Sequence, residues 1–259
     1  MLIPFIKMQA QGNDFIILDG FAWAAKGLNY SDFAIEACAF HTGIGADGLV
    51  LMLPSENADG QMLIYNSNGS QAEMCGSALR CVAYLLHNKL NKRELAIQTD
   101  SGLLAATVSP EGIVTVNLGM PKIIHKAFSA LGFSGDLVDI GNLHFIIWQN
   151  DLDSDPHLLH GARLENYQGF PQAVNVHFAK LLSPTEVQIK IWERGCGATL
   201  ACGTGAVSTV FSARQRELVE SSVQVNMPGG AVQIEALETG YLLRGEVAFS
   251  FSGDYHWRI

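Results

Sequence analysis

Apolar positions recur along this chain in short runs that alternate with polar positions or are bounded by turn residues. Such runs predict β-strands separated by turns. In the N-terminal half they occupy residues 15–20, 48–53 and several short stretches within 95–120. In the C-terminal half they occupy residues 143–148, 174–179, 187–192, 223–227, 232–237 and 241–251. We therefore expect strands throughout the chain.

Helical periodicity interrupts the strands at three places. Residues 31–40 begin with Ser31, a residue type that caps helix N-termini, and continue with apolar positions at helical spacing. Residues 76–90 and residues 205–218 predict two further helices. The apolar face expected for residues 76–90 consists of Ala78, Leu79, Val82, Ala83, Leu85 and Leu86. Helices interspersed with strands predict an α/β (α+β) fold.

Matching landmarks recur in the two halves of the chain. Cys75 and Cys202 are 127 residues apart, and so are Asn66 and Glu193, each nine positions before its cysteine. The Gly-Asn pairs that start at positions 12 and 141 are 129 residues apart. Landmarks that share nearly one offset, close to half of the 259 residues, indicate two fused copies of one α/β unit. We expect an N-terminal half of residues 1–118 and a C-terminal half of residues 119–248.

Composition and charge narrow the class of partner. Apolar residues make up 48% of the chain and charged residues 16%, which favours a well-packed globular protein over a disordered chain. The net charge is −9 and no basic run is longer than Lys92-Arg93, so neither nucleic acid nor an anionic membrane is expected as a partner. The first residues lack a secretion signal, and no apolar run reaches the roughly 18 residues of a membrane span. We expect a cytoplasmic protein that binds a small molecule.

The candidate chemistry lies in two cysteines at the starts of predicted helices. Cys75 precedes Gly-Ser and Cys202 precedes Gly-Thr. The unpaired N–H groups and positive dipole end of a helix N-terminus stabilise a thiolate and attract a carboxylate. Nucleophilic cysteines normally depend on a histidine base, and neither motif contains one. Two thiols facing each other across a cleft between the halves would instead remove a proton from one face of a carbon and return one to the other face. The chain has no pyridoxal or nucleotide-binding motif, so we expect no cofactor.

Other uses of cysteine give competing interpretations. Cys38 and Cys81 lie in apolar helical runs and are interpreted as buried packing residues, and Cys196 as a small residue in a glycine loop. A zinc site built from Cys75, Cys81 and Cys202 lacks a fourth ligand and a C-x-x-C pair, so no metal is expected. Five cysteines, an odd number, indicate thiols rather than a disulfide framework.

Taken together, the motifs resemble those of the diaminopimelate epimerases, a family of cofactor-independent enzymes with two cysteines. The segments that carry the resemblance are GNDF at position 12, HTGIGADGLVL at 41, NSNGSQAEMCG at 66, GNLHF at 141, VNVHF at 174, WERGCGATLACGTGA at 192 and LRGEVAFSFSGD at 243. The resemblance implies two similar domains, each a β-barrel-like sheet around a central helix, with the active site in the cleft between them. It also implies that a C-terminal strand, residues 249–259, returns to the first domain, and that the protein is a homodimer.

The resemblance further implies roles for individual residues. Cys75 and Cys202 would be the catalytic pair that converts LL-2,6-diaminopimelate to meso-diaminopimelate, in lysine and peptidoglycan biosynthesis. The implied substrate-binding residues are Asn13, Asn66, Gly76, Ser77, Asn142, Asn175, Glu193, Arg194, Gly203 and Thr204. The planar fork of Arg194 suits the distal carboxylate, while Glu193 or asparagine carbonyls would accept from the distal ammonium. Outside these motifs, Glu193-Arg194 would be interpreted as a solvated ion pair and the asparagines as turn residues.

Four positions depart from the family pattern. Ser77 and Ala78 stand where the family generally has Asn-Gly, Leu143 replaces a proline, and Ala198 replaces a glutamate in the loop before Cys202. Because the residues expected to bind the distal end are retained, we expect the chemistry and the substrate to persist, with an altered rate or relaxed strictness. The alternatives are a racemase of another amino acid on the same scaffold and a catalytically inactive amino-acid-binding module.

Overall fold

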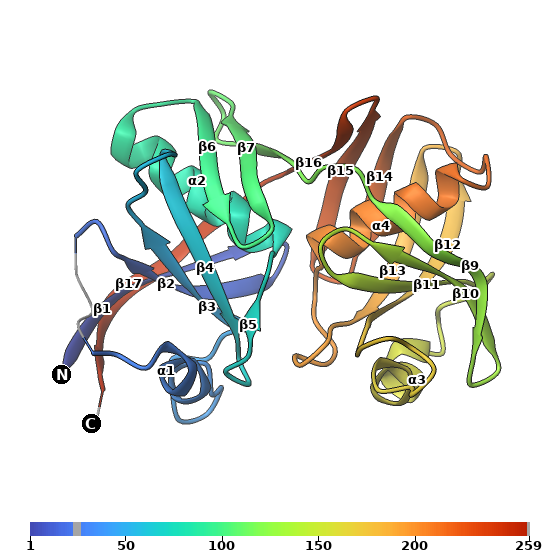
Figure 1. Cartoon of the computed structure of the whole chain (residues 1–259), viewed down its shortest axis with the longest axis horizontal. Coiled ribbons are helices and arrows are strands. Elements are labelled where there is room, and N and C mark those ends of the chain that lie inside the picture. Colours follow the sequence, from blue (N-terminus) through green and yellow to red (C-terminus); the bar gives the residue numbers. More distant parts are fainter. Residues whose placement is uncertain (23–26, 258–259) are drawn as a thin grey trace. The chain divides into compact units, whose positions relative to one another are not determined.

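A computed structural model describes residues 1–22 and 27–257 of the chain (Figure 1). Within these ranges the chain forms four α-helices and seventeen β-strands, which confirms the predicted mixed α/β class. It divides into two compact units: unit 1 comprises residues 1–116 and 246–259, and unit 2 comprises residues 117–245. Each unit is described below by itself.

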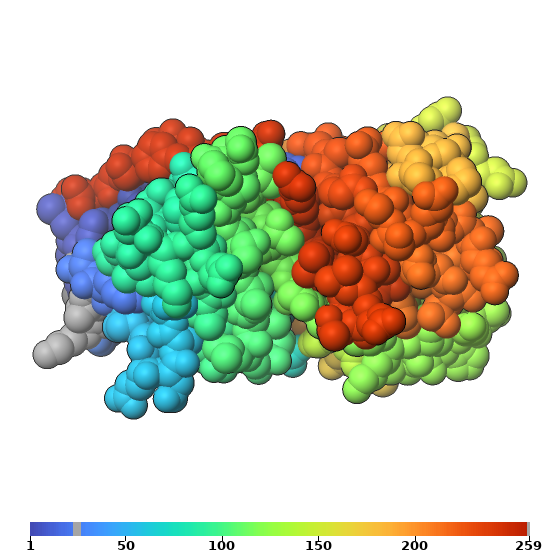
Figure 2. All heavy atoms as spheres, turned by 90° about the horizontal axis from the view of Figure 1, so that it is seen from above, coloured from blue at the N-terminus to red at the C-terminus, as the bar shows by residue number. Residues whose placement is uncertain are grey.

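Unit 1 is a single mixed sheet with two helices. Its strands are β1 (Leu2–Ala10), β2 (Asn13–Asp19), β3 (Gly48–Leu53), β4 (Gly60–Asn66), β5 (Gln71–Ala72), β6 (Glu94–Thr99), β7 (Gly102–Val108), β8 (Val114–Asn117) and β17 (Ala248–His256). Its helices are α1 (Tyr30–Ala37) and α2 (Gly76–Leu90). Strand β17 pairs antiparallel with β1, and Figure 2 shows the C-terminal residues in red beside the N-terminal residues in blue. Residues 258–259 of the predicted return strand lie outside the described residues.

Unit 2 is built from the same kinds of element. Its strands are β9 (Lys122–Ala130), β10 (Phe133–Asp139), β11 (Leu143–Trp148), β12 (Asn175–Ser183), β13 (Glu186–Trp192), β14 (Ser222–Met227), β15 (Gly230–Leu237) and β16 (Gly240–Gly245). Its helices are α3 (Pro156–Glu165) and α4 (Gly203–Arg214).

The strand pairings show that the two units are copies of one topology. In unit 1 the order β17, β1, β2, β3, β4, β6, β7, β8 has parallel pairs only at β2–β3 and β4–β6. In unit 2 the order β9 to β16 has parallel pairs only at the corresponding places, β11–β12 and β13–β14. A helix precedes the second strand of each parallel pair, as a crossover connection requires. The pseudo-symmetry expected from the sequence offset is confirmed.

One helix of each unit packs against most of its own sheet. Helix α2 contacts β1, β2, β4, β6 and β7, and α4 contacts every strand from β10 to β16 (Figure 1). In α4 every residue from Gly203 to Ala213 is buried. Small side chains let the sheet wrap closely around the helix. Two of their hydroxyls find partners: Thr209 Oγ1 donates to Gly205 O at 2.8 Å and Ser212 Oγ to Asp136 Oδ2 at 2.7 Å. These helices are the central helices that the resemblance implied.

The helix boundaries correct the sequence predictions in three places. Helix α1 is capped by Asn29, whose Oδ1 accepts from Ser31 N and Asp32 N, whereas the Ser31 hydroxyl donates to Gly69 O at 2.8 Å. Helix α4 begins two residues earlier than predicted and ends at Arg214. Helix α3 was not predicted; its signals are Pro156 in the first turn and its place one repeat offset after α1.

The second helix of each unit, α1 in unit 1 and α3 in unit 2, is an outer helix that also contributes apolar side chains to the core of its unit. In unit 1 the side chain of Phe33 from α1 packs with Ile16 and Leu49 of the sheet, and in unit 2 Leu164 from α3 packs with Phe145. None of the described helices is both long enough and apolar enough to cross a bilayer.

The buried carboxylate of Asp136 joins β10 to the C-terminal end of α4. It is 1% exposed and accepts from Arg216 Nε at 2.9 Å, Arg216 Nη2 at 2.8 Å, Ser212 Oγ at 2.7 Å and Ala127 N at 3.1 Å. Burial alone would raise the pKa of Asp136, but the hydrogen bonds from Arg216, Ser212 and Ala127 outweigh it and hold the pKa below 3.8. A carboxyl whose pKa is lowered by folding stabilises the fold above its unfolded pKa, and this contribution is lost as the pH falls through the folded pKa.

We predict that Asp136→Asn lowers the free energy of unfolding at pH 7 by about 2 kcal/mol, because Arg216 loses its partner. The difference from wild type should shrink as the pH falls from about 5 to about 3. Urea unfolding at pH 7, 5 and 3.5 measures both effects, and Asp153→Asn, at an exposed position, is the control. A difference that is absent at pH 7, or as large at pH 3.5 as at pH 7, would contradict this account.

Candidate active site

Both candidate cysteines occupy the same position in their units. Cys75 is the N-cap of α2 with φ −145° and ψ 117°, and Cys202 is the N-cap of α4 with φ −140° and ψ 108°. Neither sulfur caps its helix by a hydrogen bond, so the first-turn N–H groups have no side-chain acceptor at the cap. The prediction that both cysteines start helices is confirmed. All five cysteines are thiols rather than disulfides within the described ranges.

In unit 1 the side chain of Asn13 connects Cys75 to the half-buried carboxylate of Asp47. Asn13 Nδ2 donates to Asp47 Oδ2 at 2.7 Å, so its Oδ1 faces the Cys75 Sγ at 3.8 Å and accepts from the thiol. Asp47 also accepts from Asp14 N at 3.1 Å. Burial, followed by the charge of Asp14, raises the pKa of Asp47. Asn13 is therefore oriented with its carbonyl oxygen towards the sulfur.

Other predicted residues of unit 1 lie in two different settings. Gly76 and Ser77 form the first turn of α2, beside Cys75. Ser77 is 0% exposed and its hydroxyl has no hydrogen-bond partner within the described structure. Asn66 Nδ2 instead donates to Ser70 Oγ at 2.9 Å within its own turn. In this structure the side chain of Asn66 has a turn role, which was the alternative interpretation.

In unit 2 two buried histidines lie beside Cys202, which is itself 3% exposed. A ring nitrogen of His144, a ring nitrogen of His177 and the Cys202 Sγ all lie within 4.8 Å of one another. This cluster was not predicted from the sequence, because neither cysteine motif contains a histidine. The two histidines come from the neighbouring parallel strands β11 and β12, in the GNLHF and VNVHF motifs. Only the pairing of these strands brings them together.

The hydrogen bonds of the histidine pair determine its tautomers. Asn142 Oδ1 is an acceptor 2.9 Å from His144 Nε2, so that nitrogen carries the proton and His144 Nδ1 is an acceptor. His177 Nε2 lies 2.8 Å from His144 Nδ1 and therefore donates to it. His177 Nδ1 is left buried without a partner within the described structure. A Cβ on Gly205 would lie 2.1 Å from His177 Cε1, so glycine is required there.

Both histidines are held neutral. Burial, followed by the charges of His177 and Arg194, lowers the pKa of His144 well below 6.5, and burial lowers the pKa of His177 to about 3. At neutral pH the pair therefore supplies no imidazolium to a Cys202 thiolate. It fixes the Asn142 amide with its carbonyl oxygen towards His144.

Among the described residues, His144, His177 and Cys202 form the one group of three suited to bind a metal. Tetrahedral zinc with bonds of about 2.0–2.1 Å to nitrogen would separate two nitrogen ligands by roughly 3.3 Å. The observed 2.8 Å is a hydrogen-bond distance, and both ring nitrogens of His144 are already engaged. The cluster is therefore better suited to orienting side chains than to binding a metal.

The Glu193-Arg194 loop is held in place by α3 and by Asn175. Asn175 Oδ1 accepts from Arg194 N at 3.1 Å, and Asn175 Nδ2 donates to Leu143 O at 2.9 Å. Glu193 accepts from Thr199 Oγ1 at 2.6 Å. Glu165, the last residue of α3, accepts from Gly195 N at 3.0 Å. The side chain of Asn175 thus orients the backbone of one other predicted site residue, Arg194, and ties it to Leu143 at the start of β11.

Further predicted residues line the start of α4. Gly203 and Thr204 form its first turn, and Thr204 Oγ1 lies 3.6 Å from the Cys202 Sγ. Of the departures from the family pattern, Leu143 is buried and Ala198 is exposed. Of the predicted residues, Asn13, Gly76 and Ser77 thus lie beside Cys75, Gly203 and Thr204 lie beside Cys202, and Asn142 contacts His144 of the histidine pair.

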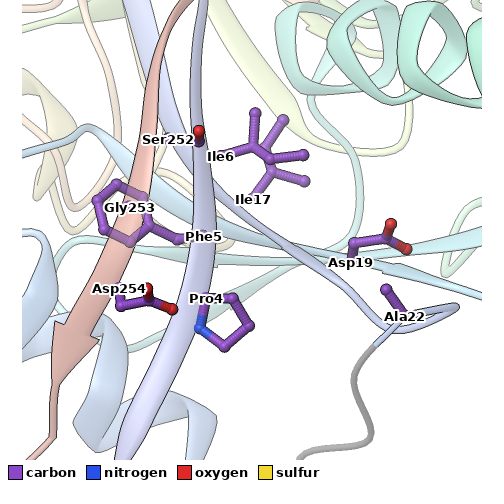
Figure 3. A pocket seen from close by; sticks show the side chains of 9 residues that line it. All are labelled: Pro4, Phe5, Ile6, Ile17, Asp19, Ala22, Ser252, Gly253 and Asp254. Carbon is purple, nitrogen blue, oxygen red and sulfur yellow. The ribbon is translucent and has the colours of Figure 1, made fainter.

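A surface pocket of about 350 Å³ in unit 1 contains none of the predicted site residues. Figure 3 shows it over β1, β2 and β17, with Phe5, Ile6 and Ile17 beside the carboxylates of Asp19 and Asp254. Asp19 already pairs with Lys89 at 2.9 Å. The pocket contains neither cysteine of the candidate pair, so it is not the place of the two-thiol chemistry that the sequence predicts.

Because folding keeps both histidines neutral, the free energy of unfolding should depend on pH. A histidine kept neutral by folding stabilises the protein fully above its unfolded pKa of about 6.5, and each pH unit below that removes about 1.4 kcal/mol. We expect His177→Gln, which keeps a donor to His144, to reduce the slope of unfolding free energy against pH by about 1.4 kcal/mol per unit between pH 6 and 4.5. Urea unfolding measures the slope, and His41→Gln, at an exposed position, should not change it. Equal slopes in wild type and His177→Gln would show that His177 is not held neutral.

Sequence comparison gives a consistent set of relatives. The chain matches the model of the family "Diaminopimelate epimerase" over residues 5–124 and 137–249. It is 38% identical to the diaminopimelate epimerase of Carboxydothermus hydrogenoformans, over 98% of this chain and 99% of that protein. It is 34% identical to the diaminopimelate epimerase of Pelotomaculum thermopropionicum, with the same two coverages of 98% and 99%.

Solved structures share the fold at low sequence identity. A hydroxyproline epimerase from Agrobacterium vitis, with bound trans-4-hydroxy-L-proline, matches with a TM-score of 0.75 and 14% identity over 98% of this chain and 92% of that one. A probable proline racemase from Agrobacterium radiobacter matches with a TM-score of 0.76 and 13% identity over 99% and 93%. At this identity the matches show the fold alone. The family model and the curated relatives, which span nearly the whole chain, show that this protein belongs to the diaminopimelate epimerase family.

Proposed function

We propose that this enzyme inverts one α-carbon of LL-2,6-diaminopimelate to give meso-diaminopimelate, and that Cys75 and Cys202 transfer the protons. The observation that carries the proposal is the pair of cysteine N-caps, which have matching backbone angles at equivalent places in two copies of one topology. Membership of the diaminopimelate epimerase family supports the substrate.

The chemistry needs no change of oxidation state. The thiolate of one cysteine takes the α-proton and becomes a thiol, and the electron pair of the broken C–H bond remains on carbon. The thiol of the other cysteine then gives its proton to the opposite face of the carbon and becomes a thiolate. This requires a state in which the two sulfurs lie on opposite faces of one carbon. No cofactor enters these steps.

The first turns of α2 and α4 are suited to bind the substrate carboxylate at the reacting centre. The backbone N–H groups of Gly76, Ser77, Gly203 and Thr204 lie in those turns, where a helix favours an anion. The same groups stabilise the negative charge that develops on the carboxylate as the proton leaves. Asn142, whose carbonyl oxygen accepts from His144, has its amide N–H groups available as donors.

The distal end of the substrate is an amino acid group, which requires a cation and hydrogen-bond acceptors. Arg194 is partly buried, its backbone is held by Asn175, and it is the proposed partner of the distal carboxylate. Glu193 is the proposed acceptor for the distal ammonium. Retention of these residues favours diaminopimelate over amino acids that lack a distal group.

The alternatives have less support. The solved structures of proline and hydroxyproline enzymes share 13–14% identity with this chain, whereas the diaminopimelate epimerases share 34–38%. An inactive binding module would not need two thiols at equivalent helix starts. A role in lysine and peptidoglycan biosynthesis, a cytoplasmic location and a homodimer stay predictions from the sequence.

We predict that inversion of LL-diaminopimelate in D2O, without added cofactor, places deuterium at the inverted α-carbon of the product. Cys75→Ala and Cys202→Ala should each lower the rate of inversion by about a thousandfold or more, because each removes a proton-transfer group. Mass spectrometry of the product measures the deuterium. Cys196→Ala is the matched control, with a rate expected within about twofold of wild type. Full activity in either of the first two variants would contradict the two-thiol mechanism.

For Arg194→Met we predict a decrease in kcat/KM of about ten- to a hundredfold, mostly through KM, because one charged hydrogen-bonded contact is lost. A coupled assay for meso-diaminopimelate over a range of substrate concentrations measures it. If Arg194→Met leaves KM unchanged, the distal carboxylate binds elsewhere.

A further inference from the structure

Arg80 is a fully buried cation in α2, five residues after Cys75 and 0% exposed. Among the residues that the structure describes, no aspartate or glutamate forms an ion pair with it. Burying a charge without an opposite charge is strongly unfavourable, and an arginine cannot escape it by losing its proton at neutral pH. The fold must therefore supply some other compensation for the guanidinium.

The direct partners of Arg80 are neutral. Nη1 donates to Gln11 Oε1 at 2.7 Å and to Glu246 O at 3.2 Å, and Nε donates to Gly76 O at 3.3 Å. Nη2 is buried and has no partner within the described structure. These acceptors orient the guanidinium but do not neutralise it. A net positive charge therefore stays inside unit 1.

The same contacts bring this charge to the Cys75 site. Gly76, which accepts from Nε, is the residue after Cys75, so the guanidinium folds back onto the first turn of α2. Gln11, which accepts from Nη1, is two residues before Asn13, whose Oδ1 lies 3.8 Å from the Cys75 Sγ. The guanidinium thus contacts the turn between β1 and β2, and the sulfur contacts the first residue of β2 directly after that turn.

The ionisable groups around Arg80 leave one candidate counter-charge. Burial lowers the pKa of Arg80 to about 10, against the charges of Cys81 and Cys75, so it stays protonated at neutral pH. Burial raises the pKa of Cys81 to about 12, so that thiol stays neutral. Asp47 accepts a hydrogen bond from Asn13, whose other amide atom faces the Cys75 sulfur, so an ionised Asp47 would disfavour a Cys75 thiolate. The remaining acid is the thiol of Cys75.

We propose that Arg80 is the buried counter-ion of the Cys75 thiolate, a positioning residue that keeps Cys75 ionised near neutral pH. The consequence for catalysis rests on the proposed function, since Cys75 would then be ready to take a proton from the substrate. In unit 2 the equivalent position, one repeat offset later, is the buried Val207. Arg80 therefore acts on one of the two thiols only.

The test is the pH dependence of alkylation of Cys75 by iodoacetamide, in a Cys196→Ser/Cys202→Ala background, with mass spectrometry to locate the label. Removing a nearby opposite charge raises a thiol pKa by about one unit or more. We expect such a rise in Arg80→Met and in Arg80→Gln, and a value close to the parent in Arg80→Lys, which keeps the charge. Arg216→Met, which removes a cation in unit 2, should have no effect on Cys75.

An unchanged pKa in the neutral variants, or an equal rise in Arg80→Lys, would overturn the proposal. Alkylation needs no turnover, so a failure of the proposed function would leave this result intact. In active enzyme with both cysteines, Arg80→Met should raise the lower pKa of the kcat/KM profile by about one unit and recover activity at high pH. A purely structural role would lower activity at every pH.

A second measurement leaves Arg80 intact and covers the case in which the neutral variants do not fold. If the thiolate is stabilised, the folded pKa of Cys75 is below the unfolded value of about 8.5. The stability of wild type relative to Cys75→Ser should then rise as the pH increases from about 6 to about 8.5. A difference that is flat over this range would overturn the proposal.

Discussion

Each unit is organised by one helix that begins at a cysteine and packs against most of its own sheet. The extended backbone of the N-cap leaves the first-turn N–H groups without a side-chain acceptor at the cap, and it places a sulfur beside them. Small residues at the start of each helix make this possible, because glycine after the cysteine lets other groups approach the first turn closely. The sheet, the loops and the outer helices then serve to hold the residues around those two positions.

The surroundings of the two sulfurs differ although the backbones match. Cys75 lies near a buried guanidinium and faces an amide that is fixed by Asp47. Cys202 lies beside two neutral histidines that fix the amide of Asn142. A duplicated topology therefore carries unequal electrostatics, which suits a reaction in which one sulfur begins as a thiolate and the other as a thiol. The outer helix α3 contributes through Glu165, which holds the loop that carries Arg194.

Much of the fold could be predicted from the sequence, because helices and strands depend on the local periodicity of apolar residues. The helix at 76–90 and most strands have clear apolar patterns, and the 127-residue offset predicted the duplication. The contact between His144 and His177 could not be predicted from the sequence, because it depends on the pairing of β11 with β12, and no local sequence pattern shows that pairing. The burial of Arg80 could not be predicted either, because a charged residue on a helix is expected to face solvent. The sequence thus predicted that both cysteines lie at helix N-termini, and the structure was needed to show which side chains surround them.

The label distribution at early times, when LL-diaminopimelate reacts in D2O, shows whether two thiols act on opposite faces of the α-carbon. Two different thiols, each acting on its own face of the carbon, predict that the first meso product carries deuterium at the inverted carbon while unreacted substrate stays unlabelled. A single base that takes and returns the same proton would give early product that retains the substrate hydrogen. That result would contradict the account.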